Sequence, residues 1–304
     1  MAALCDRVRP AVNTLDRGAG GVIEAPVTLG PDALVLCAGT IPLASFSERI
    51  AAARAGGFDG VSLRLGDYAR ARRAGLSDAD LRACLDGEGI AVAEIEALAA
   101  WRPGIVPARP GHGIAEVLDV AGAVGARSVS VVEGAGAPLP VDDAAEWFST
   151  LCDRAAAGGL LVHIEPWPGS GLDLATAAAV VAAAHRPNGG LLIDTWHLAR
   201  TDGGEASLQS IPGARITGLQ MSDSPPVVRP ESDYLEAALT RRLVPGEGAL
   251  DLIGFVRRLA ARGCRAPLGA EVWSTALASE PPTAVARRVG DAMRALLRAR
   301  DALS

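Results

Sequence analysis

Four residues with oxygen donors in their side chains stand at or near the ends of short hydrophobic runs in the second half of the chain. They are Glu165, Asp194, Gln220 and Glu271. If the runs are neighbouring strands of one sheet, three carboxylates converge at one edge, and their repulsion favours a bound cation. We therefore predict that these residues hold a divalent metal ion. Three carboxylates and an amide, without a thiolate, are typical of Mg²⁺ or Mn²⁺ rather than zinc.

The same positions offer groups that move protons. Glu165 and Glu271 belong to well-separated runs, so they could flank a substrate as the base and acid of proton transfer next to a carbonyl. His197 follows Asp194 by three residues, in the loop beyond the run, where it could act as the base or orient the substrate. One such acidic residue alone is often only a helix cap. Several together favour a catalytic site.

Tryptophan is rare in this chain but gathers near the proposed ligands. Of 5 tryptophans, Trp167, Trp196 and Trp273 lie within two residues of one of them. Aromatic rings around a polar centre suit a molecule with hydroxyl groups and an apolar ring face. We predict that they contact a small polyhydroxy or keto substrate, such as a sugar or cyclic polyol. The alternative is that the rings only fill loops.

Arginines occur at two places that could bind a substrate carboxylate or phosphate. Arg64 ends a hydrophobic run, and Arg241 and Arg242 precede a Pro-Gly-Glu-Gly segment. A guanidinium group binds such anions through paired N–H donors. The alternative for the adjacent pair is a surface contact with Glu236 or Glu247, in which at least one arginine is solvated.

Eight β-rich runs must position these residues, and helical patterns separate them. The runs span 33–38, 60–64, 90–96, 128–133, 160–165, 190–194, 216–221 and 267–272. Their starts are 26–38 residues apart, the length of a strand–helix unit, except for 51 residues before the last run. This order predicts an α/β fold, a (β/α)8 TIM barrel with its site at the carboxyl ends of the strands. An open doubly wound sheet is the rival, but no Gly-x-Gly-x-x-Gly follows an early strand.

The barrel is expected to be a single domain over 33–304, preceded by an N-terminal arm over 1–32. The arm is rich in glycine and proline and is expected to cover the barrel floor or a neighbouring subunit. A homo-oligomer is compatible with this arm and with a C-terminal helix at 282–302, although no feature specifies a symmetry. The long segment 222–248 is expected to form the main substrate loop.

Composition excludes several classes of partner. The 304-residue chain has 29 Lys+Arg against 35 Asp+Glu, a net charge of -6, so nucleic acid is not expected as a partner. No window approaches the roughly 20 apolar residues that cross a bilayer, and the N-terminus lacks the pattern of a secretory signal. The 5 cysteines are odd in number and widely spaced, which predicts reduced thiols. A cytoplasmic location without membrane contact is therefore expected.

Several short motifs resemble those of the sugar phosphate isomerase/epimerase superfamily, the xylose isomerase-like TIM barrels. The motifs are Ala-Gly-Gly-Phe-Asp-Gly-Val-Ser-Leu at 55–63, Ile-Glu-Pro at 164–166, Ile-Asp-Thr-Trp-His at 193–197, Pro-Gly-Glu-Gly at 245–248 and Ala-Glu-Val at 270–272. The resemblance implies a metal held by Glu165, Asp194, Gln220 and Glu271, with His197 contacting substrate or moving protons. Many relatives have histidine in place of Gln220, and the glutamine looks like the variant of dehydroshikimate dehydratases.

Three functions remain open from the sequence. The first is a metal-dependent isomerase or epimerase that removes a proton next to a carbonyl of a sugar, keto-sugar or related polyhydroxy compound. The second is a metal-dependent lyase of the dehydroshikimate or inosose dehydratase kind, which a substrate carboxylate at Arg241 or Arg242 would favour. The third is a non-catalytic binding protein on the same barrel. An endonuclease ranks last.

Overall fold

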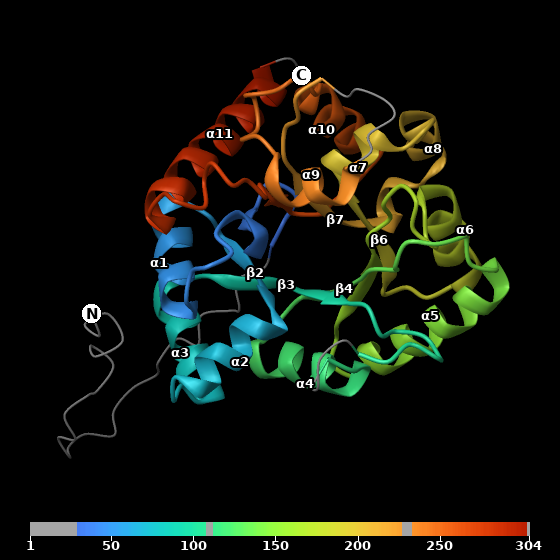
Figure 1. The fold of residues 1–304 in the computed structure, drawn as a ribbon, viewed down its shortest axis with the longest axis horizontal. Coiled ribbons are helices and arrows are strands. Elements are labelled where there is room, and N and C mark those ends of the chain that lie inside the picture. The colour runs from blue at the N-terminus through green and yellow to red at the C-terminus, as the bar shows by residue number, and fades with distance from the viewer. Residues whose placement is uncertain (1–28, 108–111, 227–232, 303–304) are drawn as a thin grey trace, which may run out of the picture.

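Eight parallel strands close into a barrel in the order β1 to β8, each paired with its neighbours in sequence and β1 paired with β8 (Figure 1). The computed structural model describes residues 29–107, 112–226 and 233–302. The strands are β1 Leu34–Leu36, β2 Gly60–Arg64, β3 Ala91–Leu98, β4 Ser128–Val131, β5 Leu161–Ile164, β6 Gly189–Asp194, β7 Ile216–Met221 and β8 Leu268–Ala270. The prediction of a TIM barrel is confirmed, with each strand inside or within two residues of its predicted run.

Helices surround the barrel and connect its strands. They are α1 Phe46–Gly56, α2 Leu65–Arg73, α3 Asp78–Glu88, α4 Ile114–Val124, α5 Val141–Ala156, α6 Leu174–Ala184, α7 Thr195–Arg200, α8 Gly204–Ser210, α9 Tyr234–Thr240, α10 Leu252–Ala261 and α11 Pro282–Ala302, with short 3-10 turns at Ala38–Thr40 and Gly213–Arg215. None of these described helices is long and apolar enough to cross a membrane.

Local sequence explains where the helices begin and end. Ser45 starts α1 with a capping box, in which its hydroxyl accepts from the backbone of Glu48 and the Glu48 carboxylate accepts from the backbone of Ser45. Gly57 ends the helix at φ 69°, a left-handed conformation that favours glycine. These caps fix how far each helix extends, and therefore where the next strand begins.

The first and last helices pack together and close the outer ring (Figure 1). A Cβ on Gly290 of α11 would lie 2.1 Å from the carbonyl oxygen of Gly56 in α1, so the close approach of the two helices needs glycine there. The apolar face of α11 buries Val285, Val289 and Met293 against the barrel. This face of α11 is therefore part of the barrel's hydrophobic core.

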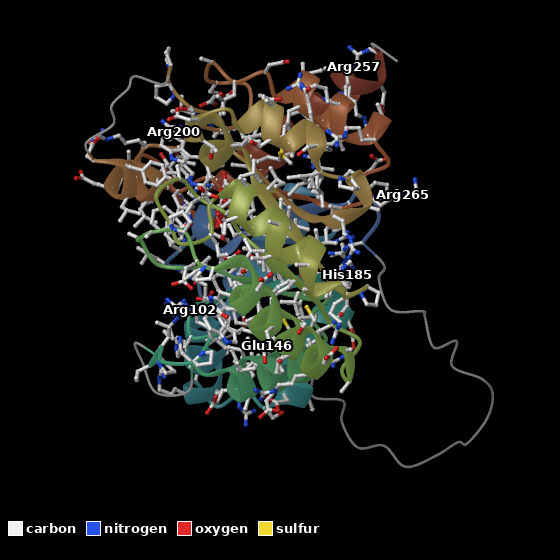
Figure 2. The ribbon with its side chains drawn as sticks, turned by 90° about the vertical axis from the view of Figure 1, so that its right-hand side faces the viewer. Arg102, Glu146, His185, Arg200, Arg257 and Arg265 are labelled. Carbon is white, nitrogen blue, oxygen red and sulfur yellow. The ribbon has the colours of Figure 1, made fainter. Side chains whose placement is uncertain are left out.

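The two ends of the barrel differ in what they carry. Figure 2 shows the molecule from the side: Arg102 and Arg200, which follow β3 and β6, lie toward one end, and His185 and Arg265, which precede β6 and β8, lie toward the other. At the second end, Leu29 packs against a small cluster of Val35, Cys37 and Ala93. The rest of the predicted arm, 1–28, lies outside the described residues.

Candidate active site

A cavity of about 710 Å³ opens at the carboxyl end of the barrel. Side chains from strand ends and from the loops beyond them line it. Its polar and aromatic lining residues include Arg64, Glu96, Glu133, Glu165, Trp167, His197, Arg242, Glu271 and Trp273. This is the end of a TIM barrel at which strand-end residues meet. The cavity therefore contains most of the residues that the sequence singles out.

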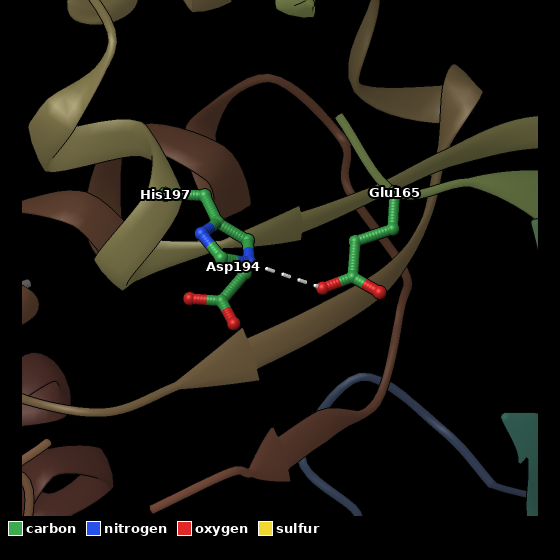
Figure 3. A group of neighbouring side chains, drawn as sticks. All are labelled: Glu165, Asp194 and His197. Carbon is green, nitrogen blue, oxygen red and sulfur yellow. Dashed lines mark ion pairs between the residues drawn. The ribbon is translucent and has the colours of Figure 1, made fainter. Parts of the chain in front are cut away.

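Glu165, Asp194 and His197 form a compact cluster at this end (Figure 3). One ligand atom of each lies within 4.8 Å of the others, and His197 Nε2 is 3.4 Å from Glu165 Oε1. Glu165 immediately follows β5, Asp194 is the last residue of β6, and His197 lies in α7. Asp194 also caps α7, because its Oδ1 accepts from the backbone N–H of Trp196 at 2.7 Å. The end of β6 and the start of α7 therefore position Asp194 and His197.

Gln220 extends this group on the adjacent strand. It is the register partner of Asp194 on β7 and is 2% exposed. Its Oε1 atom is buried and has no hydrogen-bond partner within the described part of the chain. An acceptor left in this way is costly, and a cation would satisfy it. The donor set of two carboxylates, an amide oxygen and an imidazole beside them fits a divalent ion.

The fourth predicted ligand, Glu271, lies against Arg242. The Arg242 side chain is 3% exposed, and its Nη1 contacts both Asp194 Oδ2 and Glu271 Oε2, the latter at 3.2 Å. Its Nε donates to the carbonyl oxygen of Ala238 at 2.8 Å. Burial by itself would lower the pKa of Arg242, but the two carboxylates raise the pKa above its ordinary value, so the group stays charged. Arg242 thus supplies a fixed positive charge at the cavity floor.

The same contacts set the charge of Asp194. Burial by itself would raise the pKa of this carboxyl, but Arg242 and His197 outweigh burial and hold the pKa below its usual range. Asp194 therefore stays ionised at neutral pH. An ionised carboxylate is the form that binds a cation.

Arg241, the residue before Arg242, lies at the protein surface instead. Its side chain is 53% exposed and pairs with Asp233 at 2.6 Å and with Glu236 at 3.8 Å. The alternative of a surface ion pair with Glu236 therefore describes Arg241 and not Arg242. Arg241 does not belong to the described cavity lining, so its contact with substrate stays a prediction.

The three tryptophans predicted to contact substrate lie in two different environments. Trp167 and Trp273 line the cavity, and the Arg64 guanidinium lies over the Trp273 ring at 5.5 Å. Trp196 is 1% exposed and packs against Ala237 and Ala238. Trp196 therefore packs against the segment beyond β7 and does not belong to the described cavity lining, so its contact with substrate stays a prediction.

Comparison with known proteins places this chain in a family. A family model described as xylose isomerase-like TIM barrel matches residues 50–296. The chain belongs to the xylose isomerase-like TIM barrel family. A solved structure of similar fold is that of an IOLI protein with a bound zinc atom, with a TM-score of 0.75 and 17% sequence identity, covering 88% of this chain and 99% of that one.

Two curated relatives carry the name 3-dehydroshikimate dehydratase. One, from Pseudomonas aeruginosa, is 34% identical over 149 residues, or 48% of this chain. The other, from Pseudomonas putida, is 30% identical over 118 residues, or 39% of this chain. The matches cover only 23% and 18% of those proteins' own lengths. The relatives of this xylose isomerase-like barrel are therefore enzymes, of which it spans a small part.

Three functional candidates in this family member were missed by the sequence argument. Tyr234 lies within hydrogen-bond distance of His197 Nδ1 and stacks on Trp167 with ring centroids 5.9 Å apart. Glu96 and Glu133 both line the cavity. For the two glutamates the signal was present, because each ends a predicted strand run. Tyr234 lies in the segment 222–248, expected to be the substrate loop, but its pairing with His197 needs the fold.

Proposed function

We propose that this barrel is a metal-dependent enzyme that removes a proton next to a carbonyl group of a small polyhydroxy keto compound. The observation that carries the proposal is the cluster of Glu165, Asp194 and His197 at one end of the barrel. Gln220, the register partner of Asp194 on the adjacent strand, adds an unpartnered buried Oε1 atom. A merely structural group of acids would be closed by hydrogen bonds, as polar groups in protein interiors generally are. The cavity of about 710 Å³ beside it is large enough for a small molecule.

The ion would be held by Glu165, Asp194, Gln220 and Glu271, and we propose Mg²⁺ or Mn²⁺ because these donors are oxygen atoms. A bound ion would polarise the substrate carbonyl and stabilise negative charge that develops on its oxygen. Arg242 would hold the outer oxygens of Asp194 and Glu271, and so keep both carboxylates oriented.

The protein's own residues would orient the substrate and move its proton. His197 presents Nε2 toward Glu165 while its Nδ1 is held by the Tyr234 hydroxyl, so its ring is fixed from both sides. We propose that Glu165 or His197 takes the proton next to the carbonyl. The rings of Trp167 and Trp273 would contact the apolar faces of the substrate.

Of the two reactions that this chemistry supports, we place loss of water ahead of isomerisation or epimerisation. The order differs from the one that the sequence favours, because the two curated relatives are both named dehydratases. Arg64, which lines the cavity with a side chain 30% exposed, would bind a carboxylate of such a substrate. Epimerisation would instead need a base on each side of the substrate, for which Glu165 and Glu271 are the candidates.

We also retain the proposals on organisation and location. Three buried cysteines, Cys37, Cys152 and Cys264, are free thiols, which supports a reducing compartment such as the cytoplasm. The division into an arm over 1–32 and a barrel over 33–304 also remains a proposal, as does a homo-oligomer.

The test is to incubate the purified protein in deuterated water with 3-dehydroshikimate, a keto-inositol and a ketohexose, after chelation and again after adding Mn²⁺. We expect metal-dependent loss of water from one compound, abolished in Glu165→Gln and retained in Glu146→Gln, an exposed position on α5 (Figure 2). Deuterium uptake without loss of water would instead indicate an epimerase or isomerase. A metal-loaded protein that does neither with any compound would contradict the proposal.

A further inference from the structure

Glu96 occupies the wall of the cavity that faces the proposed metal ligands. It lies near the end of β3, in register with Arg64, and is 9% exposed. The predicted ligands lie on or just beyond β5, β6, β7 and β8, and β7 is directly across the closed barrel from β3. A substrate bound on the ligand side would therefore have Glu96 on its other side.

Hydrogen bonds give the Glu96 carboxyl a defined orientation. The Ser62 hydroxyl accepts from the backbone N–H of Ala38 at 2.7 Å and donates to Glu96 Oε1. Oε1 is thus occupied as an acceptor. Oε2 forms no hydrogen bond with the described part of the chain. A proton on this carboxyl would therefore sit on Oε2, where a molecule in the cavity can reach it.

The surroundings of Glu96 disfavour its charged form. Burial is the main cause, and the neighbouring acids Glu94 on the same strand and Glu165 beyond β5 add to it. The hydrogen bond from Ser62 and the Arg64 guanidinium on β2 act in the opposite direction but are outweighed, and the pKa of Glu96 rises to about 8. Cys37 on the β1 side is buried, and its pKa is raised well above the usual value, so the thiol adds no charge.

We propose that Glu96 is a neutral carboxylic acid at physiological pH and the proton donor of the wall opposite the metal cluster. The donor role rests on the proposed function. When water is lost, Glu165 or His197 takes the proton of the broken C–H bond, the electrons of that bond form the new double bond, and the C–O bond breaks with its electron pair on oxygen. That oxygen takes the proton of Glu96 and leaves as water. The Glu96 carboxylate then regains a proton from solvent through the open cavity.

The state of the carboxyl is measured first, because this readout does not depend on activity. In infrared spectra at pH 6.5, the wild type should show a protonated carboxyl C=O band that is absent from Glu96→Gln and that disappears from the wild type as pH rises through about 8. Glu133→Gln is the matched control: it lines the same cavity but forms a fork with Arg102 at 2.8 and 3.0 Å, and it should keep the band. A Glu96→Gln spectrum identical to that of the wild type would overturn the proposal.

Turnover tests the donor role. Glu96→Gln should lower the rate of water loss by roughly 10²–10⁴-fold while metal-dependent deuterium exchange at the substrate carbon persists, and Glu96→Asp should recover part of the rate. Unchanged turnover in Glu96→Gln would overturn the donor role even if the band is present. If no compound reacts with the wild type, the proposed function fails and the donor role fails with it, whereas the infrared result still decides whether Glu96 is neutral.

Discussion

The barrel holds two layers of buried polar side chains that differ in how their polar atoms are satisfied. In the lower layer, formed by Glu94, Arg127, His163 and Thr217, Glu94 bonds to His163 Nε2 and Arg127 donates to the carbonyl oxygen of Thr217 at 3.0 Å. The cavity beside this layer is about 20 Å³, room for one water molecule. The upper layer contains Glu96, Glu165, His197 and Glu271, which line the cavity of about 710 Å³, and the buried Asp194. Gln220 lies between the layers, because it is in register with Asp194 but lines the small cavity.

Electrostatics separates the layers as well. Burial lowers the pKa of His163 to about 3 and raises that of Glu94 well above its usual value, so both partners are neutral and need no counter-ion. In the upper layer Asp194 stays ionised beside Arg242. Buried acids are thus not enough to mark a site. An ionised carboxylate, Asp194, held by Arg242, whose side chain lines the large cavity, distinguishes the upper layer.

The largest effect on stability should come from removing the charge that the upper layer keeps. Arg242→Gln leaves Asp194 and Glu271 without their buried partner and should lower the free energy of unfolding by about 3–5 kcal/mol in metal-free protein. The adjacent Arg241→Gln should cost less than about 1 kcal/mol, because its ion pairs are exposed. Urea unfolding followed by tryptophan fluorescence measures both. Equal losses in the two variants would contradict the burial argument.

The second largest effect should be on the pH dependence of the free energy of unfolding, which depends on the protonation of Glu96 in the upper layer. The folded protein holds the Glu96 proton up to about pH 8, whereas the unfolded chain releases it near 4.5, so the folded state binds more protons between these values. The free energy of unfolding should therefore fall as pH rises from about 4.5 to 8, with roughly 4 kcal/mol from this group. Denaturant titrations across the range should show a shallower slope for Glu96→Gln. An unchanged slope would count against a neutral Glu96.

A substitution in the lower layer should change the stability of the fold but not metal binding or turnover. Glu94→Gln disturbs the closed contact with His163 and should cost about 1–3 kcal/mol, because one buried group loses its matched partner. Metal affinity and turnover should stay within about twofold of the wild type. Calorimetric titration with Mn²⁺ checks the affinity. Loss of metal binding in this variant would erase the distinction between the layers.

The smallest effect should come from Tyr234→Phe. This change keeps the ring stacked on Trp167 and removes only the hydroxyl that meets His197 Nδ1. The free energy of unfolding should fall by about 1 kcal/mol, and turnover should fall more than the Michaelis constant changes, because the histidine loses its orientation rather than its contact with substrate. A change confined to the Michaelis constant would place Tyr234 on the substrate instead.

Much of this arrangement could be predicted from the sequence, because strand ends are visible as hydrophobic runs that stop at polar residues. That rule singled out Glu165, Asp194 and Gln220. It could not separate Arg241 from Arg242, since the direction of each side chain depends on how α9 ends at Thr240.

Two further residues show other limits of the sequence argument. Trp196 is close to Asp194 in sequence, but the first turn of α7 directs it into the packing against Ala237 and Ala238. Glu96 did end a predicted strand, but its importance depends on the barrel closing so that β3 faces the other half. Closure is a long-range property that no local pattern contains.

Metal analysis of the purified protein tests the central claim most directly. The wild type and Glu94→Gln are loaded with Mn²⁺, freed of excess ion and measured beside Glu165→Gln and Asp194→Asn. The account predicts one divalent ion per chain in the first two proteins and its loss in the last two, with all four folded by circular dichroism. A folded wild type that retains no ion, or a Glu165→Gln variant that retains it fully, would contradict the account.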